Sequence, residues 1–132
     1  MKYVFTFLLI ALLTSCGGPP KENTDYNKII GSPIKIENLE IAQYDFPFKM
    51  NWDEASQAST AIGDGWRIPT VEELNLIIRN ERRIEGFKKE RIYWSSSSVD
   101  FENDFFWTSG FLVGDLREKK SSLNDLRLVR TK

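Results

Sequence analysis

Residues 63–74 read GDGWRIPTVEEL, and they contain in order the signals for ending one helix and beginning another. Gly63 is able to take the left-handed conformation that closes a helix, and the Asp64-Gly65 dipeptide that follows it favours a turn. Pro69 biases the residue before it away from helical angles. The sequence therefore predicts a helix that stops at Gly63 and a short non-helical link before the next helix.

The second helix has its start signal at Thr70, because Glu73 follows at the spacing of a capping box. In the link, Trp66 and Ile68 alternate with Arg67, which in an extended chain buries two side chains and directs the third to solvent or to an acidic partner. We interpret Trp66 as a core anchor, since a ring between two helix ends is normally packed; the alternative is a ligand platform. We call the following residues the brace: Trp66, Arg67, Pro69, Thr70 and Glu73.

Apolar side chains recur at helical spacing on both sides of the brace. The first helix begins at Asn51, which is a good N-cap and has Glu54 three residues on. The predicted buried faces are Trp52, Ala55, Ser59 and Ile62 in the first helix, and Val71, Leu74, Ile77 and Ile78 in the second.

Short apolar runs elsewhere predict a small antiparallel sheet. We expect a first strand or hairpin from residues 33–36 and 39–42, a buried strand at 92–95, and a closing strand at 126–130 in which Arg127 and Arg130 alternate with apolar residues.

A second hairpin is predicted from residues 105–108 and 111–113, with Ser109-Gly110 as its turn. Residues 114–125 are polar, and we expect them to form a surface excursion. The charged connection at 80–91 contains five basic and three acidic residues. We interpret it as a solvated segment, and the alternative is a patch for anionic glycans or lipid headgroups.

The 132-residue chain has 18 basic and 19 acidic residues, so its charge does not favour nucleic acid as a partner. It has no His and one Cys. The chain therefore lacks the usual proton-transfer side chain near neutral pH, and it has neither a disulfide within one copy nor a Cys/His zinc site. This composition excludes much of enzyme chemistry.

The N-terminus has the pattern of a targeting segment. Lys2 precedes an apolar run that is too short to span a bilayer, and Leu13-Thr14-Ser15-Cys16 follows. This pattern resembles the lipobox of bacterial lipoproteins, which implies a signal peptide at 1–15 and acylation of Cys16, palmitate included; the alternative is an ordinary secretory signal with an incidental Cys.

Several acyl chains on one residue give stable anchoring. Residues 16–28 then form the lipidated end and a flexible tether, and 29–132 form the domain. Gly17 occupies the position at which Asp marks inner-membrane retention in enteric bacteria. We therefore expect placement in the outer membrane, facing either the periplasm or the surface.

Four blocks of the sequence resemble the DUF1566 family, which is also named for the C-terminal domain of a Legionella collagen-like adhesin. They are MNWDEA at 50–55, GWRIPT at 65–70 with EL at 73–74, YWSSS at 93–97 and RLVR at 127–130. The resemblance implies an α+β, C-type-lectin-like fold, with two helices packed on a small twisted antiparallel sheet and long loops on one side. It also implies kinship with the fold of sulfatase-modifying enzymes. Members of the family often carry Cys where Ser59 and Leu128 stand here; if those cysteines pair, Ser59 and Leu128 should be neighbours.

The segment from Ser95 to Asp104 combines hydroxyls, carboxylates and flanking aromatic rings, a mixture typical of carbohydrate sites. The alternative is that the tryptophans are core residues and the acids decorate a turn. The acids also supply oxygen ligands suited to calcium, although no calcium motif accompanies them. The candidate ligand-binding residues are Trp94, Ser96, Ser98, Asp100, Glu102, Asp104 and Trp107.

We therefore predict a lipid-anchored envelope protein with a non-enzymatic binding or adhesion domain for a glycan or a protein, with no catalytic residues, metal or cofactor. One alternative is a periplasmic lipoprotein with a structural or assembly role. A second is a hydrolase that uses two carboxylates, which would need a defined separation across a cleft.

Overall fold

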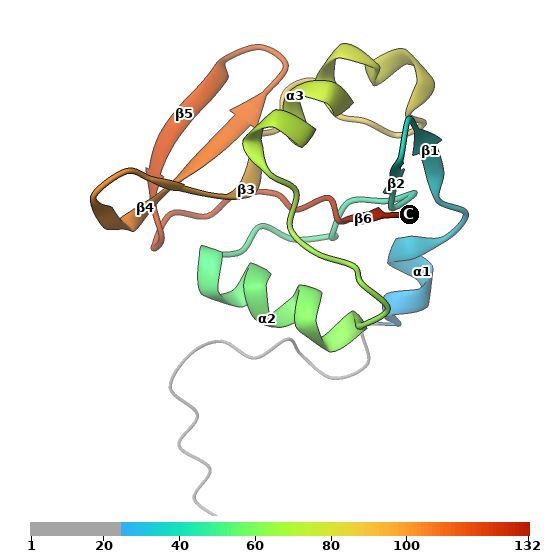
Figure 1. Cartoon of the computed structure of the whole chain (residues 1–132), viewed down its shortest axis with the longest axis horizontal. Helices are drawn as coiled ribbons and strands as arrows, with labels where there is room; N and C mark the ends of the chain where they lie inside the picture. The colour runs from blue at the N-terminus through green and yellow to red at the C-terminus, as the bar shows by residue number, and fades with distance from the viewer. Residues whose placement is uncertain (1–24) are drawn as a thin grey trace, which may run out of the picture.

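The computed structural model describes residues 25–132, which form two small antiparallel sheets and three α-helices (Figure 1). The predicted signal peptide, Cys16 and most of the tether lie outside the described residues. One sheet has the order β1-β2-β6 and the other β3-β4-β5. The elements are α1 (Tyr26–Ile30), β1 (Ile34–Ile36), β2 (Leu39–Ile41), α2 (Trp52–Ile62), α3 (Val71–Arg79), the 3-10 helix η1 (Glu81–Arg83), β3 (Tyr93–Val99), β4 (Glu102–Gly110), β5 (Gly114–Lys119) and β6 (Val129–Thr131).

The brace joins α2 to α3 as the sequence predicts. Thr70 and Glu73 form both bonds of the capping box. Arg67 donates from its two terminal nitrogens to the Glu73 carboxylate at 2.6 and 2.7 Å, and its backbone pairs with Val129. Burial opposes ionisation of Glu73, but the bonds from Arg67 and Thr70 outweigh it and lower the pKa of Glu73. The brace thus fixes the start of α3 and ties it to β6.

Trp66 is the core anchor of this brace, because only 6% of it is exposed. The Arg130 guanidinium lies 4.6 Å from its ring centroid and covers it. Trp66 is therefore not available as a ligand platform.

The helices α2 and α3 cover opposite faces of the β3-β4-β5 sheet; in Figure 1, α2 lies below the sheet and α3 lies beside its upper part. Adjacent residues on a strand point to opposite faces. Trp94 packs in one cluster with Ala55 and Ala58 of α2, whereas Tyr93 packs in the other with Leu74 of α3. The chain therefore builds two cores that share β3.

The α2 core is organised by tryptophans whose indole nitrogens are satisfied. The Trp94 indole donates to the Met50 carbonyl at 2.7 Å, and the Trp52 indole donates to the Ser95 carbonyl at 3.0 Å. Trp52 also stacks on Phe106 with ring centroids 4.0 Å apart. Asn51 caps α2 by accepting from the Glu54 amide, so the predicted helix start is confirmed.

The second hairpin differs from its prediction. The strand β4 continues through Gly110, the turn occupies residues 111–113, and β5 uses residues that we expected to form a surface excursion. A Cβ atom on Gly110 would lie 2.7 Å from the Arg91 carbonyl oxygen, so this glycine serves a close approach within a strand and not a turn. The turn was predicted at the wrong place because the apolar residues at 111–113 have the composition of a strand, although they are exposed.

Two other boundaries are corrected. The 95–104 segment is not a loop, because β3 runs to Val99, β4 begins at Glu102 and a two-residue turn joins them. Residues 26–28, predicted as tether, belong to α1, which Asp25 caps. The apolar pattern is too short, both around the β3–β4 turn and in the five-residue helix α1, to predict either feature from the sequence.

The predicted closing strand is also shorter than expected, since 126–128 are irregular and only 129–131 form β6. Without strand alternation, Arg127 points inward and is 1% exposed. Its Nε donates to Asp45 at 2.5 Å and its Nη1 donates to the carbonyls of Ala42 and Gln43. A buried guanidinium thus holds the segment that precedes β6.

Asp45 is the centre of a buried polar cluster. Besides Arg127, it accepts from the Tyr93 hydroxyl at 2.8 Å and from Arg91 at 3.0 Å. Burial, together with the negative charge of Asp45, raises the pKa of Tyr93. The cluster joins the segment after β2 to β3 and to the C-terminal segment.

Asp125, beside this cluster, predicts a pH dependence of stability. It is 3% exposed, one of its oxygens has no hydrogen-bond partner among the described residues, and Arg91 lies 3.6 Å from the other. Burial raises the pKa of Asp125, so its ionised form is disfavoured in the folded state. Stability should fall as pH rises from about 4, the ordinary Asp value, through the raised pKa.

Asp125→Asn should remove this loss, so that the midpoint of thermal unfolding of the variant falls less than that of the parent between pH 4 and 7. Asp100→Asn, at an exposed turn, is the control. If the parent instead gained stability relative to Asp125→Asn as the pH rises from 4 to 7, the raised pKa of Asp125 would be contradicted.

Candidate ligand-binding site

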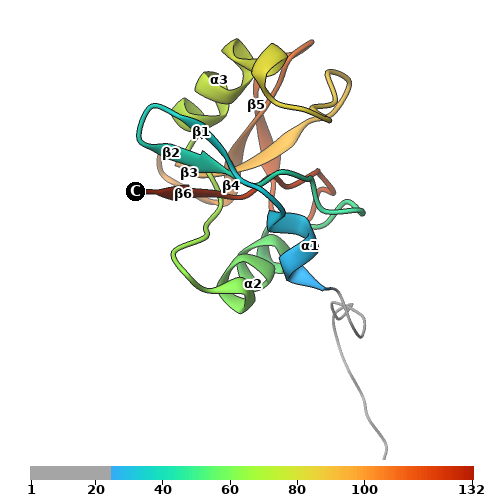
Figure 2. The same cartoon turned by 90° about the vertical axis from the view of Figure 1, so that its right-hand side faces the viewer.

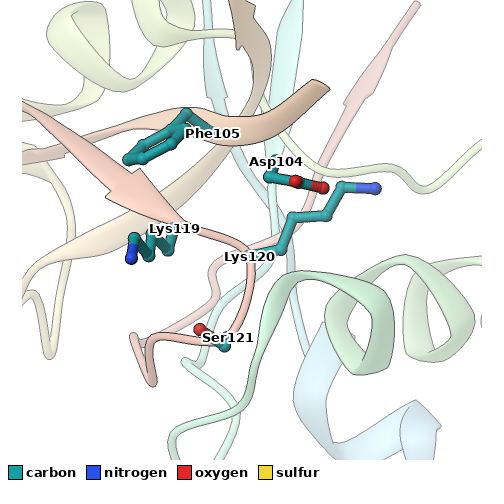
Figure 3. Close-up of a pocket in the computed structure, with 5 residues that line it drawn as sticks. All are labelled: Asp104, Phe105, Lys119, Lys120 and Ser121. Carbon is teal, nitrogen blue, oxygen red and sulfur yellow. The ribbon is translucent and has the colours of Figure 1, made fainter. Parts of the chain in front are cut away.

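A hollow of about 490 Å³ lies at the end of the β4–β5 pair. Figure 3 shows that its side chains come from β4, from the end of β5 and from the chain that leaves β5. Phe105 and Lys119 are cross-strand neighbours, and the Lys120 amide donates to the Asp104 carbonyl at 2.8 Å, which fixes the strand ends. The lining residues are Asp104, Phe105, Lys119, Lys120 and Ser121.

Three polar side chains of the hollow are not used by the fold. Asp104, Lys119 and Ser121 are exposed, and within residues 25–132 their side chains have no hydrogen-bond or ion-pair partner. A carboxylate, an ammonium and a hydroxyl therefore lie around one hollow with their bonding capacity free.

The Phe105 ring is half-buried, and one cation already lies on it. The Arg117 guanidinium is 4.3 Å from the ring centroid, and it also forms an ion pair with Glu102. Arg117 is paired across the sheet with Trp107, which is also half-buried. Phe105 and Trp107 stand two residues apart on β4 and so point to the same face of the sheet.

Lys120 differs from Lys119 because the fold uses its charge. Its ammonium lies 5.2 Å from the Trp52 ring centroid and 5.5 Å from that of Phe106, and 3.9 Å from Asp53 at the start of α2. Figure 3 shows Lys120 and Asp104 on one side of the strand pair and Phe105 with Lys119 on the other. Lys119 is therefore the cation that remains free for a ligand.

These groups suit recognition of a sugar. A carboxylate accepts from ring hydroxyls, and an ammonium donates to hydroxyls or pairs with an acidic substituent. A pyranose that packed its C–H face on Phe105 would share the ring with Arg117 or displace it. Because Asp104 lies on one side of the strand pair and Phe105 with Lys119 on the other, a ligand that used all of these groups would have to lie across the strand ends.

The structure brings together only part of the predicted site. Asp104 lines the hollow, and Trp107 lies on the same strand face as Phe105. Trp94 is 0% exposed and belongs to the core, so its assignment as a ligand residue is wrong. An aromatic side chain at this point of β3 faces α2 instead of solvent.

The remaining predicted residues lie outside the hollow. Ser96 and Ser98 are exposed on β3, and the Ser96 amide donates to the Pro69 carbonyl at 2.8 Å. Asp100 is exposed in the turn, and Glu102 is occupied by Arg117. In the described part of the chain no group of three or more His, Cys, Asp or Glu is placed to hold a metal ion, so Asp100, Glu102 and Asp104 do not converge as calcium ligands.

Sequence reasoning missed Phe105, Lys119, Lys120 and Ser121 as site residues. A correct prediction of the β4–β5 pairing would have indicated these residues, because that pairing places Phe105 opposite Lys119. The misplaced turn at Ser109-Gly110 concealed this pairing.

Comparison with known proteins identifies the fold. No protein-family model matches the sequence, and no curated protein matches it either. Among solved structures, the chain is similar to the snake C-type-lectin-like proteins botrocetin and EMS16, the latter described as an antagonist of the collagen receptor integrin alpha2beta1. Botrocetin has a TM-score of 0.57 at 11% identity, covering 77% of this chain and 98% of its own. EMS16 has a TM-score of 0.57 at 9% identity, covering 76% and 97%. The fold is α+β and C-type-lectin-like.

Proposed function

We propose that this protein is a lipid-anchored envelope protein whose C-type-lectin-like domain binds a glycan, without enzymatic chemistry, at the end of the β4–β5 pair. The observation that carries the proposal is the set of unpartnered polar side chains around the hollow, beside the Phe105 ring. The fold supports only the general part of the proposal, a binding module, since the structural neighbour EMS16 is described as an antagonist of an integrin, which is a protein partner.

The chemistry of the hollow favours binding over hydrolysis. Hydrolysis of a glycoside by the usual route needs two carboxyl groups on either side of the scissile bond. The hollow is lined by one, that of Asp104. The next carboxylate along β4, Glu102, is in an ion pair with Arg117.

Phe105→Ala and Lys119→Gln are each expected to weaken glycan binding by about tenfold, because loss of one stacking contact or one charge-assisted bond is worth about 1.4 kcal/mol. Glycans are first identified on an array that includes neutral and acidic oligosaccharides. The affinities of the parent and the variants are then measured by calorimetry, with and without calcium.

Lys35→Gln is the matched control, because Lys35 is an exposed lysine on β1 of the other sheet. It should bind as the parent does. An array with no positive glycan, or Phe105→Ala and Lys119→Gln variants that bind as tightly as Lys35→Gln, would refute the proposed site.

Lipid anchoring rests on the lipobox-like sequence that ends at Cys16. In cells fed labelled palmitate, the parent should incorporate the label and fractionate with the outer membrane, and Cys16→Ser should do neither. Within the described residues, none of the helices combines the length and the apolar character that crossing a bilayer requires.

A further inference from the structure

We infer that the turn at 111–113, which we call the FLV tip, together with the basic residues next to it, docks onto an anionic lipid surface. Phe111, Leu112 and Val113 are 39%, 69% and 50% exposed. Single exposed apolar residues are common on protein surfaces, but a run of three has a functional reason or is a liability. These residues occupy a tight turn that joins two strands, and they pack in neither core.

The FLV tip is held beside the basic connection that follows α3. The Lys89 ammonium lies 4.8 Å from the Phe111 ring centroid. Gly110 lies so close to the Arg91 carbonyl that even a Cβ atom would not fit, which fixes the tip against this segment. The tip and the connection therefore lie side by side, with Lys89 as the cation in contact with the apolar side chains.

The charge of this surface is complementary to anionic headgroups. With Arg79 at the end of α3 included, five exposed basic residues stand against four acids, which are the three of the connection and Asp115, so the excess of positive charge is one. Glu81 among those acids is paired with Lys89 at 3.4 Å and Arg82 at 3.8 Å. Asp115, the acid next to the tip, accepts from Ser109 and Asn75, which are neutral groups, so it still counts among the acids of this surface. The exposed basic residues are Arg79, Arg82, Arg83, Lys88 and Lys89.

A bilayer surface fits this arrangement better than a protein groove. The apolar residues form the end of a hairpin, with cations beside it where headgroups would lie, which is how interfacial elements meet a membrane. The tip lies at the opposite end of the domain from α1, where the described chain begins (Figures 1 and 2). A lipid on Cys16 would therefore not by itself bring the tip to a bilayer, and this inference is independent of the proposed glycan site.

The test is co-sedimentation of the chain carrying Cys16→Ser with vesicles of phosphatidylcholine alone or mixed with phosphatidylglycerol. This background removes any lipid anchor. Binding to the anionic vesicles should exceed binding to the neutral ones by at least about tenfold, and Leu112→Asp should reduce it by a similar factor. The double variant Lys88→Gln/Lys89→Gln should also weaken binding, by roughly fivefold per charge removed.

Leu123→Asp is the matched control, since Leu123 is 59% exposed against 69% for Leu112 and lies outside the tip. Because Leu123 lies outside the tip, the binding of this variant should equal that of the parent. All of the variants share the same N-terminal residues, so any binding by that segment is common to them. Equal binding to both kinds of vesicle, no binding to either, or equal effects of the two Asp substitutions would overturn the inference. The last two results would leave a protein partner as the occupant of the tip.

Discussion

Asp45→Asn is expected to lower the free energy of unfolding by about 3–5 kcal/mol. The substitution preserves the size of the side chain but removes the charge on which two guanidinium groups converge. Arg127 is 1% exposed and its Nε lies 2.5 Å from Asp45, and Arg91 donates to the other carboxylate oxygen at 3.0 Å. Removal of one partner leaves a buried charge uncompensated, which costs more than the loss of a hydrogen bond.

Urea unfolding measured by tryptophan fluorescence gives this free energy. Asp53→Asn is the control, because Asp53 is 67% exposed and lies 3.9 Å from Lys120; an exposed pair of this kind contributes about 0–1 kcal/mol. Equal losses for the two variants would show that the Asp45 cluster does not hold the C-terminal segment in place.

Trp94→Ala is expected to destabilise the protein by about 3–5 kcal/mol, the usual cost of removing a buried large aromatic side chain. Trp94 is fully buried between β3 and α2, and its indole donates to the Met50 carbonyl at 2.7 Å. The substitution creates a cavity in the α2 core and also leaves that carbonyl without its donor.

Phe101→Ala provides the comparison, since this side chain is fully exposed at the β3–β4 turn. Thermal and urea unfolding of this variant should match the parent. If Trp94→Ala abolished ligand binding at unchanged stability, Trp94 would be a ligand residue and its assignment to the core would be wrong.

The sequence predicted the parts of the fold that local chemistry determines. The capping box at Thr70, the N-cap at Asn51 and the helix end at Gly63 each depend on residues within a few positions. The same holds for the β1–β2 hairpin, whose apolar residues are close in the chain. The two helices on a small sheet agree with the fold that the family resemblance implied.

The errors arise where long-range pairing decides the outcome. Arg127 is buried because Asp45, 82 residues away, supplies its charge partner, and no local pattern indicates this. Gly110 looked like a turn residue, but the nearby Arg91 carbonyl is the reason for its lack of a side chain. The site shifted in the same way, since the acids and the two tryptophans between 94 and 107 were recognised, but Phe105 and Lys119, which lies opposite it on β5, were not.

The most direct test of the proposed glycan site is amide and indole chemical-shift mapping during titration with the best oligosaccharide from the array. If the glycan binds at the end of the β4–β5 pair, the shifts should concentrate at residues 104–107 and 117–121, and Lys119→Gln should reduce them. Shifts confined to the 95–101 segment, or to the helices with residues 104–107 and 117–121 unchanged, would contradict it.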